Sequence, residues 1–386
     1  MTKMSGNNRN IPGGTRDIMF TEAELYRSLE TGLTELYKGS GFCEIMTPVI
    51  EYYDVFKTGS TLGQEQMYKL TDPDGRLLVL RADNTTPIAR VAATRLGGVN
   101  KLFYHQKVYR LSPGHTGRKS EIAQSGVEIL GASGIQSDLL CLVTAIETLS
   151  SFSDDYKLEL GHVGFYNALI SDMELDEEDA KNLRKLVEAK DINKISGYEK
   201  IKKIPFLFGG EEIFDEATAL ADGNADALSA LEYLKKLYNA LCDAGYKDKI
   251  MIDLGIVHAL DYYTGVVFKG YMDGAASPVL AGGRYDTLIS RFNNDIPATG
   301  FGVNVSEVAD TIMRANKDVK VLREVEKELV CFDETGLGEA LEYVKNSAFA
   351  ELSPIESLVG NIEYAKKAGF GVLVSFVNGE KNAMKV

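Results

Sequence analysis

Apolar residues at helical spacing predict the first element of the chain. Over residues 21–38, Leu25 and Leu33 lie on the same helix face, with further leucines between and after them. Thr21 precedes this run as an N-cap, and Glu24 three residues later completes a capping box. Glycines follow and end the helix. The pattern therefore predicts a helix that buries one apolar face.

Short apolar runs separated by Gly-, Pro- and Ser-rich connections predict a sheet after this helix. Pro48 lies inside the first run, and a residue without an N–H group is tolerated only at a sheet edge or a strand end. The predicted strands cover residues 42–51, 77–81, 102–109 and 125–130, and the next helix covers residues 138–151.

The middle of the chain is dominated by charged helical patterns. Asp176 to Asp179 place negative charge at a helix start, which suits the helix dipole, and residues 225–241 carry leucines along one side. We therefore expect a helical insert at about residues 165–248 that interrupts the sheet. Afterwards come strand-like segments at 249–254 and 265–270, and a short helix after residues 282–286.

A third region follows residue 315, and it alternates strands and helices. This order predicts a small α/β domain over residues 316–386. No element is predicted for residues 378–386, and residues 1–10 form a polar tail that we expect to be disordered. The expected strands are residues 328–332 and 371–376, and the expected helices are residues 336–346 and 356–368.

Length, charge and cysteine usage limit the class of protein. A chain of 386 residues is long enough for two or three domains. With 56 acidic and 42 basic residues its net charge is −14, which disfavours a large phosphate-binding surface and argues weakly against tRNA binding. The sequence shows neither a membrane span nor an apolar signal segment, so a cytoplasmic location is expected. Four scattered cysteines predict buried reduced thiols and no metal site.

Three polar segments stand out from the sheet pattern. Leu80-Arg-Ala-Asp-Asn-Thr-Thr86 places a carboxylate after a predicted strand, and Leu260-Asp-Tyr-Tyr263 contains two adjacent tyrosines. Gln124 and Glu128 are four residues apart in a strand and so share a face. Carboxylates and phenols can bind an amine or an imidazole ring. Taken singly, these features also fit a helix cap, a solvated strand face and packed aromatic rings.

Taken together, the segments resemble the histidine-contacting motifs of histidyl-tRNA synthetases, a class II family. The resemblance extends over about residues 11–311, and residues 41–48 are similar to the first class II motif, which builds a dimer interface around its proline. It implies an α+β fold. Residues 11–315 would form the class II synthetase-like domain, an antiparallel sheet flanked by helices and carrying the helical insert, and residues 316–386 the small C-terminal domain.

The resemblance also implies a site for histidine. Asp83 stands where the family has a glutamate that receives the ammonium group, and Glu128 can accept a proton from one imidazole nitrogen while Tyr262 or Tyr263 bonds the ring from the other side. Arg110 keeps the place of an arginine that contacts the ATP α-phosphate. The implied histidine-binding set is Asp83, Thr85, Arg110, Gln124, Glu128, Tyr262 and Tyr263.

The residues at positions that bind the nucleotide in the synthetases differ from the synthetase pattern. His258 and Glu307 replace two arginines, and a carboxylate facing a triphosphate is repulsive. Each lost cation should remove about 2–4 kcal/mol of transition-state stabilisation. Further replacements are Ser112 for a glutamate, Pro113 for an arginine and Ile122 for a phenylalanine that stacks on the base.

This combination resembles the synthetase-like regulatory subunits of ATP phosphoribosyltransferase. The resemblance implies a non-catalytic chain without a cofactor, which self-associates as a dimer and assembles with the short-form catalytic subunit. That complex makes phosphoribosyl-ATP from ATP and phosphoribosyl pyrophosphate in the first step of L-histidine biosynthesis. L-Histidine would be the feedback effector, acting through the retained pocket.

Two alternatives remain open at the level of sequence. An active histidyl-tRNA synthetase would have to rely on Arg110 and Arg118 for its phosphate chemistry. A synthetase-like amino-acid sensor would act with another partner.

Overall fold

The computed structural model describes residues 10–60, 62–111, 119–171, 173, 175–195, 197–257, 262–315, 327–347, 349–355 and 357–386. These residues form two compact units, one made of the described residues up to Ala315 and the other of those from Lys327 onward. Almost all of the predicted tail, and the predicted domain boundary after residue 315, lie outside the described residues.

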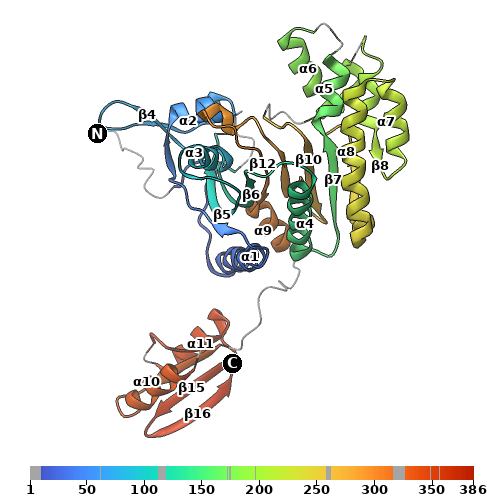
Figure 1. Ribbon diagram of the computed structural model, residues 1–386. Helices are drawn as coiled ribbons and strands as arrows, with labels where there is room; N and C mark the ends of the chain where they lie inside the picture. Colours follow the sequence, from blue (N-terminus) through green and yellow to red (C-terminus); the bar gives the residue numbers. More distant parts are fainter. Residues whose placement is uncertain are drawn as a thin grey trace. The chain divides into compact units, whose positions relative to one another are not determined.

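A nine-stranded sheet organises the first unit (Figure 1). Six neighbouring strand pairs are antiparallel, and two, β1–β5 and β7–β9, are parallel. The predicted α+β architecture is confirmed, although the sheet is not purely antiparallel. In spatial order the strands are β1 (Cys43–Glu44), β5 (Asn100–Tyr109), β6 (Glu121–Leu130), β12 (Ala298–Asn304), β11 (Leu280–Arg284), β10 (Val266–Met272), β7 (Tyr156–His162), β9 (Ile250–Asp253) and β8 (Phe208–Gly209).

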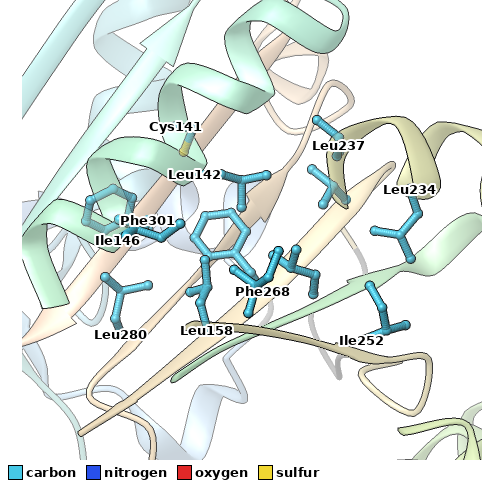
Figure 2. Packing of buried hydrophobic residues seen from close by; sticks show 14 of the residues in the cluster. Cys141, Leu142, Ile146, Leu158, Leu234, Leu237, Ile252, Phe268, Leu280 and Phe301 are labelled. Carbon is cyan, nitrogen blue, oxygen red and sulfur yellow. The ribbon is translucent and has the colours of Figure 1, made fainter. Parts of the chain in front are cut away.

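Three helices cover one face of this sheet, namely α1 (Phe20–Gly39), α4 (Ile135–Phe152) and α9 (Val305–Arg314). Figure 2 shows side chains of α4, including Leu142 and Ile146, against Phe268 and Phe301 of the strands. In β6 the odd-numbered residues, such as Val127, join this core. The even-numbered residues, including Gln124 and Glu128, therefore point to the opposite face.

Helix α1 buries the predicted leucines, but its predicted capping box is wrong. The N-cap is Met19, which makes no side-chain capping hydrogen bond, so Thr21 already lies within the helix. Burial of Leu25, Leu29 and Leu33 stabilises this helix without a cap.

The predicted strand over residues 42–51 is two short strands in different sheets. Pro48 lies between them and cannot donate to a strand ladder. The intervening backbone is held by Arg81, whose guanidinium donates to the carbonyl of Thr47 at 2.8 Å. The second sheet consists of β2 (Ile50–Tyr52), β4 (Leu77–Leu80) and β3 (Lys69–Thr71). Helix α2 (Tyr53–Gly59) follows β2, the turn η1 (Gln64–Gln66) precedes β3, and helix α3 (Thr85–Arg95) follows β4.

Between β7 and β9 lies the predicted helical insert. Asp176 caps α6 by accepting from the Asp179 amide at 2.8 Å, and Asn224 caps α8 in the same way. Leu234 and Leu237 of α8 are fully buried. The helices are α5 (Val163–Ser171), α6 (Glu177–Glu188), α7 (Ile213–Ala221) and α8 (Ala225–Leu241). The shorter turns are η2 (Ile192–Lys194), η3 (Ile201–Phe206), η4 (Cys242–Tyr246) and η5 (Lys247–Lys249), and η6 (Ile289–Phe292) follows β11.

The second unit is a four-stranded sheet with one helix on each face. Alternate residues of β13 (Glu328–Phe332) point to opposite sides, so that Val330 packs with Ala340 of α10 (Leu337–Asn346) and Leu329 with Ala365 of α11 (Leu358–Ala368). The strand order is β14 (Ala350–Leu352), β13, β15 (Val372–Val377) and β16 (Glu380–Lys385).

Strand β16 lies in the segment for which no element was predicted. Asn378 and Gly379 have φ angles of 54° and 75°, which makes them a two-residue hairpin turn between β15 and β16. The Asn-Gly pair was the sequence signal for this hairpin, because both central positions of such a turn need positive φ.

Cysteine burial differs from the prediction at two positions, because Cys242 is only partly buried and Cys43 is exposed. Cys141 and Cys331 are buried, and all four cysteines are free. Across the described part of the chain, no helix combines the length and apolarity that crossing a membrane would need.

Candidate functional site

A cavity of about 380 Å³ opens on the face of the large sheet opposite α1, α4 and α9. It is lined by all seven residues of the predicted site: Asp83, Thr85, Arg110, Gln124, Glu128, Tyr262 and Tyr263. Ten further residues complete the lining: Ser60, Leu62, Asn84, Tyr104, Glu188, Ala281, Tyr285, Gly300, Phe301 and Gly302.

Small residues of adjacent strands form the floor of the cavity. Gly302 and Ala281 face each other in register across β12 and β11 and line the cavity. Gly300, opposite Glu128, has no room for a side chain, because an added Cβ would lie 2.0 Å from Glu128 Oε2. The glycines thus create the hollow in which the polar side chains converge.

Asp83 and Thr85 are positioned by the start of α3. One oxygen of the Asp83 carboxylate accepts from the Thr86 amide at 2.7 Å, and the other accepts from Ser60 Oγ at 2.9 Å. Thr85 Oγ1 donates to Glu128 Oε1 at 3.0 Å. Each carboxylate oxygen can accept more than one hydrogen bond, so Asp83 retains capacity for a cationic ligand group.

Glu128 is the most enclosed acid of the cavity, with 1% of its surface exposed. Burial raises the pKa of its carboxyl to about 7, and the nearby charge of Asp83 acts in the same direction. Hydrogen bonds from Tyr285 and Thr85 oppose the rise. The group therefore gains or loses a proton near neutral pH.

Arg110 and Gln124 present donors to the cavity. Arg110 Nε donates to the Ala82 carbonyl at 2.7 Å, which orients the guanidinium. Asn84 donates to Gln124 Oε1 at 3.2 Å and to the Gln106 carbonyl at 3.4 Å. Because its oxygen is engaged in this way, Gln124 directs its NH₂ group elsewhere and can donate to a ligand.

Tyrosines form one wall of the cavity. The ring centroids of Tyr262 and Tyr263 lie 4.8 Å apart, and Tyr285 meets Tyr262 edge to face at 5.8 Å. The Thr264 amide donates to the Arg284 carbonyl at 2.8 Å, which joins this segment to β11. Aromatic walls with a few converging polar groups are typical of small-molecule sites.

Comparisons with known proteins place the chain in a family. The histidyl-tRNA synthetase family profile matches residues 14–308. An ATP phosphoribosyltransferase regulatory subunit of Clostridium botulinum is 38% identical over 98% of this chain and 94% of that protein, and one of Clostridium kluyveri is 39% identical over 86% and 89%. The chain belongs to the family of ATP phosphoribosyltransferase regulatory subunits. Members of this family are non-catalytic subunits of an enzyme complex, which confirms the predicted lack of independent enzymatic activity.

Solved structures agree with this regulatory-subunit family and its synthetase-like fold. A Bacillus halodurans protein described as an ATP phosphoribosyltransferase regulatory subunit/histidyl-tRNA synthetase is 27% identical, with a TM-score of 0.81 over 96% of this chain and 99% of that one. A histidyl-tRNA synthetase of Nostoc, 18% identical, has a TM-score of 0.78 over 98% and 97% of the two chains and shows the fold alone.

Two of the positions predicted to have lost nucleotide contacts, Glu307 and Ile122, lie within the described residues. Glu307 lies in the first turn of α9, where Arg314 Nη2 pairs with its carboxylate at 3.1 Å. Arg314 therefore does not replace the missing cation. Neither Glu307 nor Ile122 lines the cavity. The other altered positions, Ser112, Pro113 and His258, lie outside the described residues, as does Arg118.

Several lining residues were missed by the sequence analysis of this family member. Tyr285 follows the Gly282-Gly283-Arg284 run, and its position after two glycines and an arginine was the available signal. Asn84 was adjacent to Asp83 but was not singled out. Glu188 comes from the insert, and no local pattern indicated that α6 reaches the cavity. Within the described residues, no group of three or more His, Cys, Asp or Glu side chains could hold a metal ion.

Proposed function

We propose that the cavity binds L-histidine and that this binding mediates feedback inhibition of ATP phosphoribosyltransferase. The observation that carries the proposal is the convergence of all seven predicted residues in one cavity. They come from the start of α3 and the residues before it, from β6 and the end of β5, and from the segment before β10, which are far apart in the sequence.

The lining offers a complementary partner for each part of histidine. Asp83 and Thr85 would receive the ammonium group, and Arg110 with the Gln124 amide would receive the carboxylate. Glu128 would accept a hydrogen bond from the imidazole ring, whose flat faces suit the tyrosine wall. Because the ring and Glu128 both titrate near neutral pH, one proton can be held between them in the complex.

The partner that we propose is the short-form catalytic subunit, with which this chain forms a cytoplasmic hetero-oligomer. The names of the relatives support such an assembly. We also propose self-association through the segment around Pro48, where apolar side chains are exposed. Met46 is 78% exposed, and Ile50 and Tyr52 are each nearly half exposed. A second copy covering them would remove this apolar surface from water.

Inhibition would follow from differential affinity. Histidine that binds one conformation of the complex better shifts the population toward that conformation. A coupling free energy of about 1–3 kcal/mol changes the affinity of the other ligands by roughly 5- to 150-fold.

Calorimetric titration tests the proposal. Histidine is titrated into the chain alone, and into the chain with the short catalytic subunit and phosphoribosyl pyrophosphate. Saturable binding together with loss of transferase activity is expected. An absence of binding in both titrations, histidine-dependent ATP–pyrophosphate exchange by the chain, or failure to stimulate the catalytic subunit would each contradict the proposal.

A further inference from the structure

The segment ahead of helix α1 is tied to the strand pair β5–β6. We call residues 12–18 the strap. It begins with a turn in which the Thr15 amide donates to the Pro12 carbonyl at 3.1 Å, and Gly14 has a φ of 78°. The carbonyl of Gly14 accepts from the Ser120 amide at 2.7 Å, just before β6 begins. The strap therefore contacts the strand pair through a backbone hydrogen bond.

Ser120 connects the strap to Arg110, which lines the cavity. The Ser120 amide donates to Gly14, and the Ser120 carbonyl accepts from the Arg110 amide at 2.8 Å. Ser120 is buried, so water competes little for either hydrogen bond. A second support is independent of the strap, because the Leu111 amide donates to the Gln66 carbonyl at 2.8 Å. Displacing the strap should therefore shift Arg110 without releasing it.

Gly14 has no room for a side chain against Ser120. A Cβ added to Gly14 would lie 2.4 Å from Ser120 Oγ and 2.8 Å from the Ser120 amide nitrogen, so the strap or the start of β6 would have to move. The positive φ of Gly14 would strain any other residue as well. At Gly13, by contrast, an added Cβ meets nothing within 4 Å. The strap thus offers a disruptive and a neutral substitution at neighbouring positions.

Arg16 holds the later part of the strap against two helices. Its Nη2 donates to Tyr26 Oη of α1 at 3.3 Å and to Asp310 Oδ1 of α9 at 2.9 Å. The guanidinium also pairs with Glu22 of α1. Lys119, close to the start of β6, donates to the same Asp310 carboxylate at 2.5 Å. The strap and the start of β6 therefore share one anchor on α9.

We infer that the strap is a positioning element for the cavity, and that it holds Arg110 where the guanidinium can bind the carboxylate of the ligand. The inference rests on the proposed function, in which Arg110 receives that carboxylate. Neither Gly14 nor Arg16 lines the cavity, so both act through Arg110 and are positioning residues. Charge-assisted hydrogen bonds depend on alignment, so a small shift of the guanidinium weakens carboxylate binding in particular. A ligand without a carboxylate should be indifferent to the strap.

Paired calorimetric titrations of the full chain with L-histidine and histamine test the inference. Histamine keeps the ammonium group and the imidazole ring but lacks the carboxylate. Gly14→Ala should weaken L-histidine binding by roughly tenfold, a part of what a charge-assisted hydrogen bond contributes, and should leave histamine affinity unchanged. Gly13→Ala is the matched control and should bind both ligands like the wild type. In an Arg110→Met chain, adding Gly14→Ala should have no further effect on L-histidine affinity.

Arg16→Met provides a second variant in case the Gly14→Ala chain does not fold. It should show the same selective loss, whereas Arg27→Met, which removes an exposed arginine that pairs with Glu30 within α1, should not. A wild-type chain that binds no L-histidine would refute the proposed function itself. If the wild type does bind it, three results would each overturn the positioning inference: an equal loss of both ligands, an unchanged ratio of the two affinities in the strap variants, or equal affinity of the wild type for both ligands.

Discussion

At the residue scale, Glu128 combines burial, two hydrogen-bond donors and a position opposite Gly300, where no side chain fits. The sequence predicts that Gln124 and Glu128 point to the same face of the sheet, because a strand alternates its side chains with a strict period of two. The raised pKa of Glu128 could not be predicted, since it depends on the surrounding fold.

Replacing Glu128 with Gln should change the pH dependence of stability. The folded-state pKa of about 7 exceeds the ordinary value of 4.5, so the folded protein binds this proton more tightly than the unfolded chain. That stabilisation is complete below pH 4.5 and is lost as the pH rises through 7. Glu128→Gln has no such proton to lose. As the pH rises from 4.5 through 7, its free energy of unfolding should therefore increase by up to about 3 kcal/mol relative to that of the wild type.

Urea unfolding across this pH range measures the difference between the two proteins. The exposed Glu178 of α6 provides the control, and Glu178→Gln should track the wild type at every pH. A difference between Glu128→Gln and wild type that did not vary with pH would show that Glu128 ionises normally.

Replacing Asp83 with Asn should weaken histidine binding by roughly 10- to 100-fold. A charge-assisted hydrogen bond to an ammonium group contributes about 1.5–3 kcal/mol, and a neutral amide loses most of it. Calorimetry gives the affinity. Asp74→Asn, at a carboxylate that is 75% exposed, is the matched control and should bind normally. Equal affinity of the two variants would place the ammonium group elsewhere.

At the element scale, the strands under the cavity require glycine. Gly300→Ala in β12 should abolish measurable histidine binding and destabilise the chain, because its Cβ would lie 2.4 Å from the Val127 carbonyl as well as against Glu128. Gly338→Ala in α10, where nothing lies within 4 Å, should instead stabilise its helix by about 0.5–1 kcal/mol. Calorimetry measures histidine binding by the Gly300 variant, and urea unfolding measures the stability of both variants. A Gly300→Ala protein that still bound histidine would contradict this geometry.

The pair formed by Arg284 and Asp138 joins three elements. Arg284 of β11 contacts the Asp138 carboxylate of α4 at 2.8 Å, and Tyr233 of α8 donates to the same carboxylate at 2.7 Å. Asp138→Leu should destabilise the chain by about 3–5 kcal/mol, because it leaves a buried guanidinium with less compensation. Adding Arg284→Met should recover part of that loss.

A double-mutant cycle in urea measures this coupling. The exposed pair of Lys236 and Glu232 on α8 is the comparison, and the same cycle there should give less than about 1 kcal/mol. Similar coupling at both pairs would show that burial does not strengthen the Arg284–Asp138 interaction.

Elements with a strong local pattern were predicted well, and those that depend on partners were not. Helix α8 and strand β13 have the predicted bounds, because leucine spacing and a short apolar run specify them locally. The division between β1 and β2 was missed, since only pairing with β5 or β4 decides to which sheet each residue belongs.

At the scale of the whole molecule, the two units have separate hydrophobic cores, and we propose that they act as separate domains. Leu329→Ala, at a fully buried position of the second unit, should destabilise that unit by about 2–5 kcal/mol without altering histidine affinity. Hydrogen exchange measures the stability of each unit separately. Leu234→Ala in the first unit is the reciprocal variant. Faster hydrogen exchange in both units of the Leu329 variant would contradict the proposal that the two units are independent domains.

From the sequence alone, the resemblance of its motifs to known families predicted the family, the class II architecture and seven of the residues that line the cavity. The motifs that carry this resemblance, and the strand and helix periods that predict the elements, are local properties of the chain. The tertiary structure alone decided that Tyr285 bonds Glu128, that Asn84 orients Gln124, and that Glu188 of the insert lines the cavity. These contacts depend on strand register and helix placement, which arise only when segments distant in the chain pack together.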